Sequence, residues 1–128
     1  MIRNIACLVA IGLILSGITA AAGDLEKEAG AVYAAERWLS MVDNAQYAES
    51  WESTSELFKN AVRLEQWKQS MQAIRAPLGQ IVSRRVSIKT YATSLPGAPD
   101  GEYVVIHFDT TFENKKAAVE TVTPMMDR

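Results

Sequence analysis

The sequence is poor in the residues from which most metal and thiol sites are built. Its 128 residues include a single cysteine, Cys7, and a single histidine, His107. Structural zinc sites use four ligands drawn mainly from these two residue types, so a usual zinc site cannot be assembled. One cysteine also forms no intramolecular disulfide. We therefore expect a domain held together by its core, with no metal and no cofactor.

Other signatures of common enzyme classes are missing as well. The sequence has no glycine-rich phosphate loop and no Gly-x-Ser-x-Gly motif. Its carboxylates do not follow the spacing of a calcium-binding loop. The net charge is −2, so the chain lacks the excess of basic residues that is typical of nucleic-acid binding. These absences argue against phosphate-loop enzymes, serine hydrolases of that type and nucleic-acid binding.

Residues 1–22 have the pattern of a secretory signal peptide. Arg3 gives a positive start, residues 5–15 form an apolar run, and residues 20–22 are three alanines. An uncleaved membrane anchor is the alternative, but the apolar run is short for a span of about 20 residues. We expect cleavage, a periplasmic or secreted location, and no membrane attachment afterwards. The mature chain would then be one domain, residues 23–128.

Apolar residues recur at helical spacing through the first part of this domain. Residues 25–42 form one such stripe, which Asp24 is placed to cap. Residues 47–62 continue it, and the capping box Ser53-x-x-Glu56 indicates two short helices joined near Ser53. A further stripe, residues 67–78, is ended by proline and glycine. We expect about three helices.

From Gln80 onward the apolar period changes to two, which is typical of strands. Strands are predicted from residue 80, over residues 103–112 and over residues 117–123, with a turn at residues 114–116. Helices followed by neighbouring strands predict an α+β domain. We expect the N-terminal helices to pack on an antiparallel sheet of three or more strands.

Many spaced elements of the sequence follow a pattern shared with a known family. They are Asp43-x-x-x-Tyr47-x-x-x-Trp51, Gln66-Trp67, Arg75-x-Pro77-Leu78-Gly79, Ser83-Arg84, Pro99 to Val105, Phe112 and Glu120 to Thr123. Together they span residues 33–123 and resemble the exported bacterial family called domain of unknown function 4019. That family is similar in turn to the nuclear-transport-factor-two-like, or cystatin-like, folds, in which helices and a curved sheet form a cone around a pocket. The resemblance implies a cone-like fold and brings no activity.

The C-terminal end departs from the family pattern. Family members typically continue with one more strand, whereas this sequence stops at residues 125–128. The expectation is that the domain lacks a final strand and that strand 117–123 is an exposed edge. An exposed edge can pair with another chain, so the sequence predicts a homodimer through it.

Two charged residues fall on faces that are otherwise apolar. Glu36 lies in the apolar arc of the first helix, and Arg84 is in phase with the apolar residues of the first strand. An unpaired buried charge is very costly. Either these groups line a ligand pocket with Trp38 and Phe108, or they form an ion pair that fastens helix to sheet. Arg75 is a third candidate for this polar group.

The remaining candidates have simpler interpretations. His107 and Asp109 share one face of a strand and could form an acid–base pair. Strand alternation places them opposite the apolar face, so a surface histidine is expected. Trp38, Trp51 and Trp67 lie on helical apolar stripes and are expected in the core.

The function predicted from these observations is a non-catalytic periplasmic module that binds an unknown small molecule or an envelope protein. The alternative is a small acid–base enzyme, isomerase- or dehydratase-like, with Glu36 as its pocket carboxylate. That alternative rests on fold analogy. A third interpretation is a structural envelope protein that acts through its sheet edge.

Overall fold

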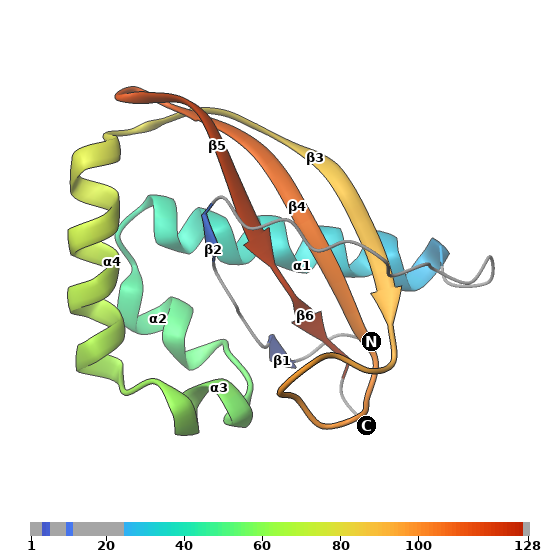
Figure 1. The fold of residues 1–128 in the computed structure, drawn as a ribbon. Coiled ribbons are helices and arrows are strands. Elements are labelled where there is room, and N and C mark those ends of the chain that lie inside the picture. Colours follow the sequence, from blue (N-terminus) through green and yellow to red (C-terminus); the bar gives the residue numbers. More distant parts are fainter. Residues whose placement is uncertain (1–3, 6–9, 12–24, 127–128) are drawn as a thin grey trace.

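The computed structural model describes residues 4–5, 10–11 and 25–126 of the chain. The four helices are α1 (Leu25–Asp43), α2 (Tyr47–Glu52), α3 (Glu56–Ala61) and α4 (Leu64–Leu78). The strands are β1 (Asn4–Ile5), β2 (Ala10–Ile11), β3 (Ile81–Ala92), β4 (Tyr103–Phe112), β5 (Lys115–Val122) and β6 (Pro124–Met125). The predicted α+β class and the order of helices before the main strands are confirmed (Figure 1).

The N-terminal predictions fall largely outside this description. The Asp24 cap and most of the predicted signal peptide lie outside the described residues. In the part of the chain that is described, no helix combines the length and the apolar character needed to cross a membrane.

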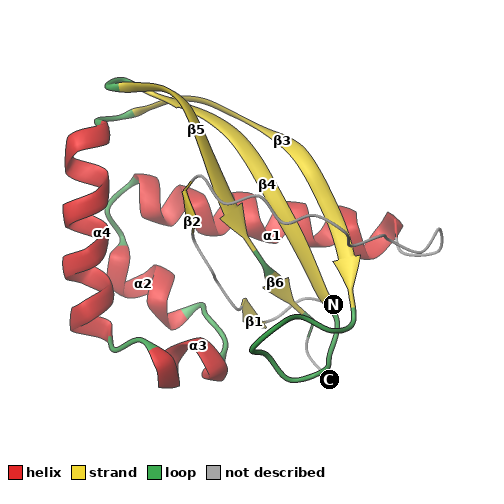
Figure 2. Ribbon diagram, viewed as in Figure 1, coloured by secondary structure: helices red, strands yellow, loops and turns green. Residues whose placement is uncertain are grey.

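The sheet is antiparallel and is built around β4. β3 pairs with one side of β4, while β5 and then β6 pair with the other side. α1 lies against one face of the curved sheet, and α4 stands at the end where β4 turns into β5 (Figure 2). The β4–β5 connection is a two-residue turn at residues 113–114, slightly earlier than the predicted turn.

The core forms between α1, α4 and the helix-facing side of β4 and β5. Trp38 and Trp67 are both buried, with ring centroids 5.8 Å apart. Their indole N–H groups donate to the carbonyl and the hydroxyl of Ser50, at 2.8 and 3.0 Å. Trp51 packs against this core and donates to the carbonyl of Val62. The predicted core positions of the three tryptophans are confirmed.

The predicted break between two short helices occurs at the expected place but uses a different cap. Ser55, not Ser53, caps α3, since its hydroxyl accepts a hydrogen bond from the amide of Phe58 at 3.2 Å. The hydroxyl of Ser53 instead donates back to the carbonyl of Glu49, at 3.0 Å. A serine in the last turn of a helix commonly bonds to the preceding turn, so Ser53 ends α2 and does not begin α3.

The predicted surface position of His107 is wrong. Its side chain is 3% exposed, and Val105 and Thr121, next to it on the same face, are buried as well. The alternation along β4 was predicted correctly, with Phe108 facing the helices. The wrong assumption was that the opposite face is open to solvent.

Gly79, between α4 and β3, packs against the β4–β5 turn and so fixes the end of the helix against the sheet. Its φ is +75°, and an added Cβ would lie 3.0 Å from side-chain atoms of Glu113 and Asn114. The backbone amide of Asn114 donates to the carbonyl of Leu78, at 3.0 Å. Glycine is required here both for this backbone conformation and for the close approach. The junction places the last turn of α4, with Arg75, beside the sheet.

Candidate functional site

The four residues predicted to share a pocket lie in three different environments. Glu36 is exposed, which corrects the expectation that it projects into the apolar face of α1. Trp38 and Phe108 are each 1% exposed within the packed core. Arg84 is largely buried, as its phase predicted, but its partners are residues other than Glu36. None of the three recesses described below is lined by Glu36, Trp38 or Phe108.

Arg84 is the centre of a buried ion cluster. Its guanidinium contacts Asp43, at the end of α1, through two bonds of 2.8 and 3.0 Å. It contacts Glu120, on β5, through two more of 2.7 and 3.1 Å. Such paired bonds match the planar fork of arginine to the two oxygens of each carboxylate. Arg84 therefore ties the end of α1 to both β3 and β5.

Two further residues extend this cluster. Arg75, on α4, donates to Asp43 at 2.7 Å, and its guanidinium lies 4.9 Å from the ring centroid of Phe112. The hydroxyl of Thr110, on β4, donates to Glu120 at 2.5 Å. We define the ion cluster as Asp43, Arg75, Arg84, Thr110 and Glu120. It joins α1, α4, β3, β4 and β5.

The electrostatics of the ion cluster are those of a closed, charge-balanced network. It contains two carboxylates and two guanidinium groups, with side chains 3–14% exposed. Burial alone would raise the pKa of Asp43, but hydrogen bonds from Arg84 and Arg75 outweigh it and hold the pKa below its usual 3.8. Burial disfavours the charge of Arg84, yet Asp43 and Glu120 raise its pKa overall. All the charges are used internally, so the cluster acts as a fastening between helices and sheet.

Asp43 and Glu120 are the residues that sequence reasoning missed. Asp43 was noted only as an element of the family pattern. Glu120 is in phase with Ala118 and Val122, both buried on the face that it shares. This alternation along the strand was the available signal, because it places a carboxylate on a buried face. It could have identified Glu120 as a partner for Arg84. Both carboxylates lie far along the chain from Arg84, so only the fold brings the three together.

The ion cluster predicts acid sensitivity. Because the folded-state pKa of Asp43 is lowered, its contribution to stability is present above the unfolded pKa of 3.8 and is lost as pH falls through the folded value. Urea unfolding between pH 7 and 2 should therefore show a drop in stability below about pH 4. In Asp43→Asn that drop should become smaller. Asp109→Asn is the matched control, since Asp109 is 46% exposed and meets Arg85 only at 3.6 Å. A wild-type acid profile in Asp43→Asn would contradict this assignment.

An apolar recess lies between α3 and the β3–β4 loop. Its volume is about 280 Å³. It is lined by Leu57, Phe58, Ala61, Val62, Leu95, Pro96, Gly97, Ala98, Tyr103 and Thr123. The hydroxyl of Tyr103 donates to the carbonyl of Pro99 and is not offered to a ligand. The recess therefore presents almost only apolar surface.

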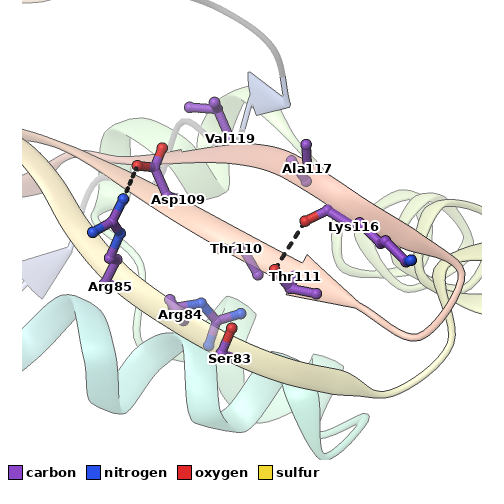
Figure 3. A pocket seen from close by; sticks show the side chains of 10 residues that line it. Ser83, Arg84, Arg85, Asp109, Thr110, Thr111, Lys116, Ala117 and Val119 are labelled. Carbon is purple, nitrogen blue, oxygen red and sulfur yellow. Dashed lines mark hydrogen bonds and ion pairs between the residues drawn. The ribbon is translucent and has the colours of Figure 1, made fainter.

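Two other recesses are polar. One, of about 390 Å³, is a depression over β3, β4 and β5 (Figure 3). There the exposed side chains of Arg85 and Asp109 pair with each other, and the hydroxyl of Thr111 donates to the carbonyl of Lys116. The other polar recess, of about 350 Å³, is lined in part by Asp43 and Arg75 of the ion cluster. Over the described ranges, no group of three or more His, Cys, Asp or Glu residues could hold a metal ion.

A family model described as "Protein of unknown function (DUF4019)" matches residues 34–128. The chain belongs to this family. The matched span contains the whole ion cluster and the whole apolar recess of this DUF4019 protein. No curated protein and no solved structure matches the chain. The family resemblance predicted from the sequence is confirmed, while the similarity to the cone-shaped folds stays a prediction.

Proposed function

We propose that this protein is an exported, non-catalytic binding protein whose site is the apolar recess beside α3. The N-terminal signal-peptide pattern supports export to the periplasm or beyond. The observation that carries the binding proposal is the recess itself, a hollow with an apolar lining between α3 and residues 95–98. Ligand sites are usually concave and mostly apolar.

The size and lining of the recess define the ligand class. Its volume of about 280 Å³ is at the small end of ligand sites. The buried ring of Tyr103 contributes apolar surface, while Leu57 is 42% exposed. With the Tyr103 hydroxyl already engaged, few polar groups remain to orient a polar metabolite. The ligand that fits is a small apolar molecule, such as one aromatic ring or a short branched hydrocarbon.

The enzymatic alternative depended on Glu36 as a carboxylate inside a pocket, and Glu36 does not line the apolar recess. General acid–base chemistry needs a titratable side chain at the reacting atoms. No Asp, Glu or His lines the apolar recess, and Glu36 is exposed. Asp43 and Glu120 are bound to arginine side chains. The non-catalytic proposal needs none of these groups.

The test is thermal unfolding in the presence of small apolar compounds, for example indole, toluene and isobutanol. A ligand that binds only the folded state raises stability by about 2.7 kcal/mol at one hundred times its Kd. We expect at least one of these compounds to raise the Tm. Ala61→Trp, which fills the recess, should abolish that shift.

Ala48→Trp is the matched control, since Ala48 is an exposed residue of α2 that does not line the recess. It should keep the ligand-induced shift. The proposal fails if no compound of the panel raises the Tm, or if Ala61→Trp and Ala48→Trp respond alike.

A further inference from the structure

The two long edges of the sheet differ in how they are protected. β3 carries two register irregularities, between Ile81 and Ser83 and between Val86 and Ile88. It also carries the exposed basic residues Arg85 and Lys89. Bulges and charges are the devices by which proteins prevent edge strands from pairing with other chains. The β3 edge is therefore poorly suited to pair with a further strand.

The β5 edge lacks these devices. Beyond the two lysines that begin β5, residues 117–122 carry one charged side chain, Glu120, and it is held by Arg84 and Thr110. No register irregularity is found between β4 and β5 over residues 118–122 of β5. The edge therefore presents a regular backbone with no unpaired charge along it.

The structure also shows that this edge accepts an antiparallel strand. Ala10 and Ile11 of β2 are in register with Thr121 and Glu120 of β5. Further along, β1 pairs antiparallel with β6 (Figure 1). In the described part of the chain, β1 and β2 are the elements on this outer edge of β5 and β6. Both lie within residues 1–22, the segment with the signal-peptide pattern.

We propose that, once residues 1–22 are removed, the β5 edge pairs with the β5 edge of a second copy, antiparallel, to make one sheet across a dimer. The proposal rests on the export step of the proposed function and not on ligand binding. Both strands seen on this edge are antiparallel to it. Antiparallel pairing of an edge with itself has two-fold symmetry, so one surface serves both copies. A partner with a different sequence is not needed.

The dimer should be weak and reversible. Only about six residues on each side, 117–122, contribute to the pairing, and small interfaces give transient complexes. The chain without residues 1–22 keeps every member of the hydrophobic core cluster, which spans residues 31–122. It also keeps the complete ion cluster. The shortened chain therefore retains the contacts on which the fold depends.

The experiment is sedimentation equilibrium on residues 23–128 and on the full chain, with circular dichroism and cooperative thermal unfolding as checks of folding. We expect concentration-dependent dimers for residues 23–128 and monomers for the full chain. Val119→Lys in residues 23–128 should weaken dimerisation at least tenfold, because the two introduced lysines approach each other across the two-fold axis. Within one copy the lysine lies opposite Asp109, so the fold tolerates it.

Val82→Lys is the matched control, since Val82 is a valine on the other edge strand, β3, and is 64% exposed. It should leave the dimer intact. A synthetic peptide of residues 3–12 should compete with the second copy and return residues 23–128 to monomers. The proposal is overturned if folded residues 23–128 stay monomeric at all concentrations, or if Val82→Lys disrupts the dimer and Val119→Lys does not. Ligand-induced Tm shifts in Val119→Lys report on the apolar recess alone, so failure of either proposal is recognised separately.

Discussion

Replacing Arg84 with alanine should destabilise the protein by about 3–5 kcal/mol, the usual cost of removing one partner from a buried ionic group. The substitution removes four hydrogen bonds, two to each carboxylate. Glu120, whose side chain is 3% exposed, is left with only the Thr110 hydroxyl. The free energy of unfolding, measured in urea by circular dichroism, tests this.

The neighbouring residue supplies a matched control. Arg85 is on the same strand, but its side chain is 83% exposed and contacts Asp109 at 3.6 Å. Arg85→Ala should change stability by less than about 1 kcal/mol, as for other surface ion pairs. Adding Glu120→Ala to Arg84→Ala should cost less than the sum of the two single substitutions, because the residues share one network. Equal effects of Arg84→Ala and Arg85→Ala would show that the ion cluster does not fasten the fold.

Trp38→Ala should cost a similar amount, about 3–5 kcal/mol, because it opens a large cavity in the core. Trp38 is 1% exposed, and its ring packs against that of Trp67. The substitution also leaves the buried carbonyl of Ser50 without the hydrogen bond from the indole, which adds to the cost. Thermal and urea unfolding measure the effect.

Small domains are marginally stable, so Trp38→Ala can unfold the protein outright. Trp38→Phe keeps most of the ring and should remain folded with a smaller loss, about 1–3 kcal/mol. Tyr33→Ala is the control on the same helix, since Tyr33 is 63% exposed. A loss in Tyr33→Ala as large as that in Trp38→Ala would contradict the assignment of Trp38 to the core.

These predictions separate stability from binding. The ion cluster and the Trp38 core determine whether α1 and α4 stay on the sheet. The apolar recess is formed mainly by α3 and the β3–β4 loop, and its lining includes neither Trp38 nor any member of the ion cluster. A variant such as Arg85→Ala is therefore expected to keep the ligand-induced Tm shift.

The sequence determined the elements of this fold because they depend on local periodicity. The stripe in residues 25–42 became α1, and the alternation in residues 103–112 became β4. Gly79 ended α4 where the pattern indicated, since its conformation favours glycine. The stripe in residues 47–62 also faced the core as its spacing predicted, with Tyr47 and Phe58 packed against it.

The candidate site was predicted only in part. Arg84 was recognised as a candidate because the alternation along its strand places a charged side chain on an apolar face. Glu36 was misplaced because a helical stripe has a broad margin, and whether a residue there is buried depends on how the helix rotates against its neighbours. His107 was misplaced because alternation gives the face of a side chain and not whether that face is covered.

By itself, the sequence determined the family, the α+β class, the export pattern and the anomaly at Arg84. Only the tertiary structure decided which residues pair with this buried arginine. Asp43 and Glu120 lie 41 and 36 positions from Arg84 along the chain, yet both meet its guanidinium. Pairing over such distances depends on how helices pack on the sheet and on strand register, neither of which a local pattern encodes. For the same reason, the apolar recess became visible only in the folded chain.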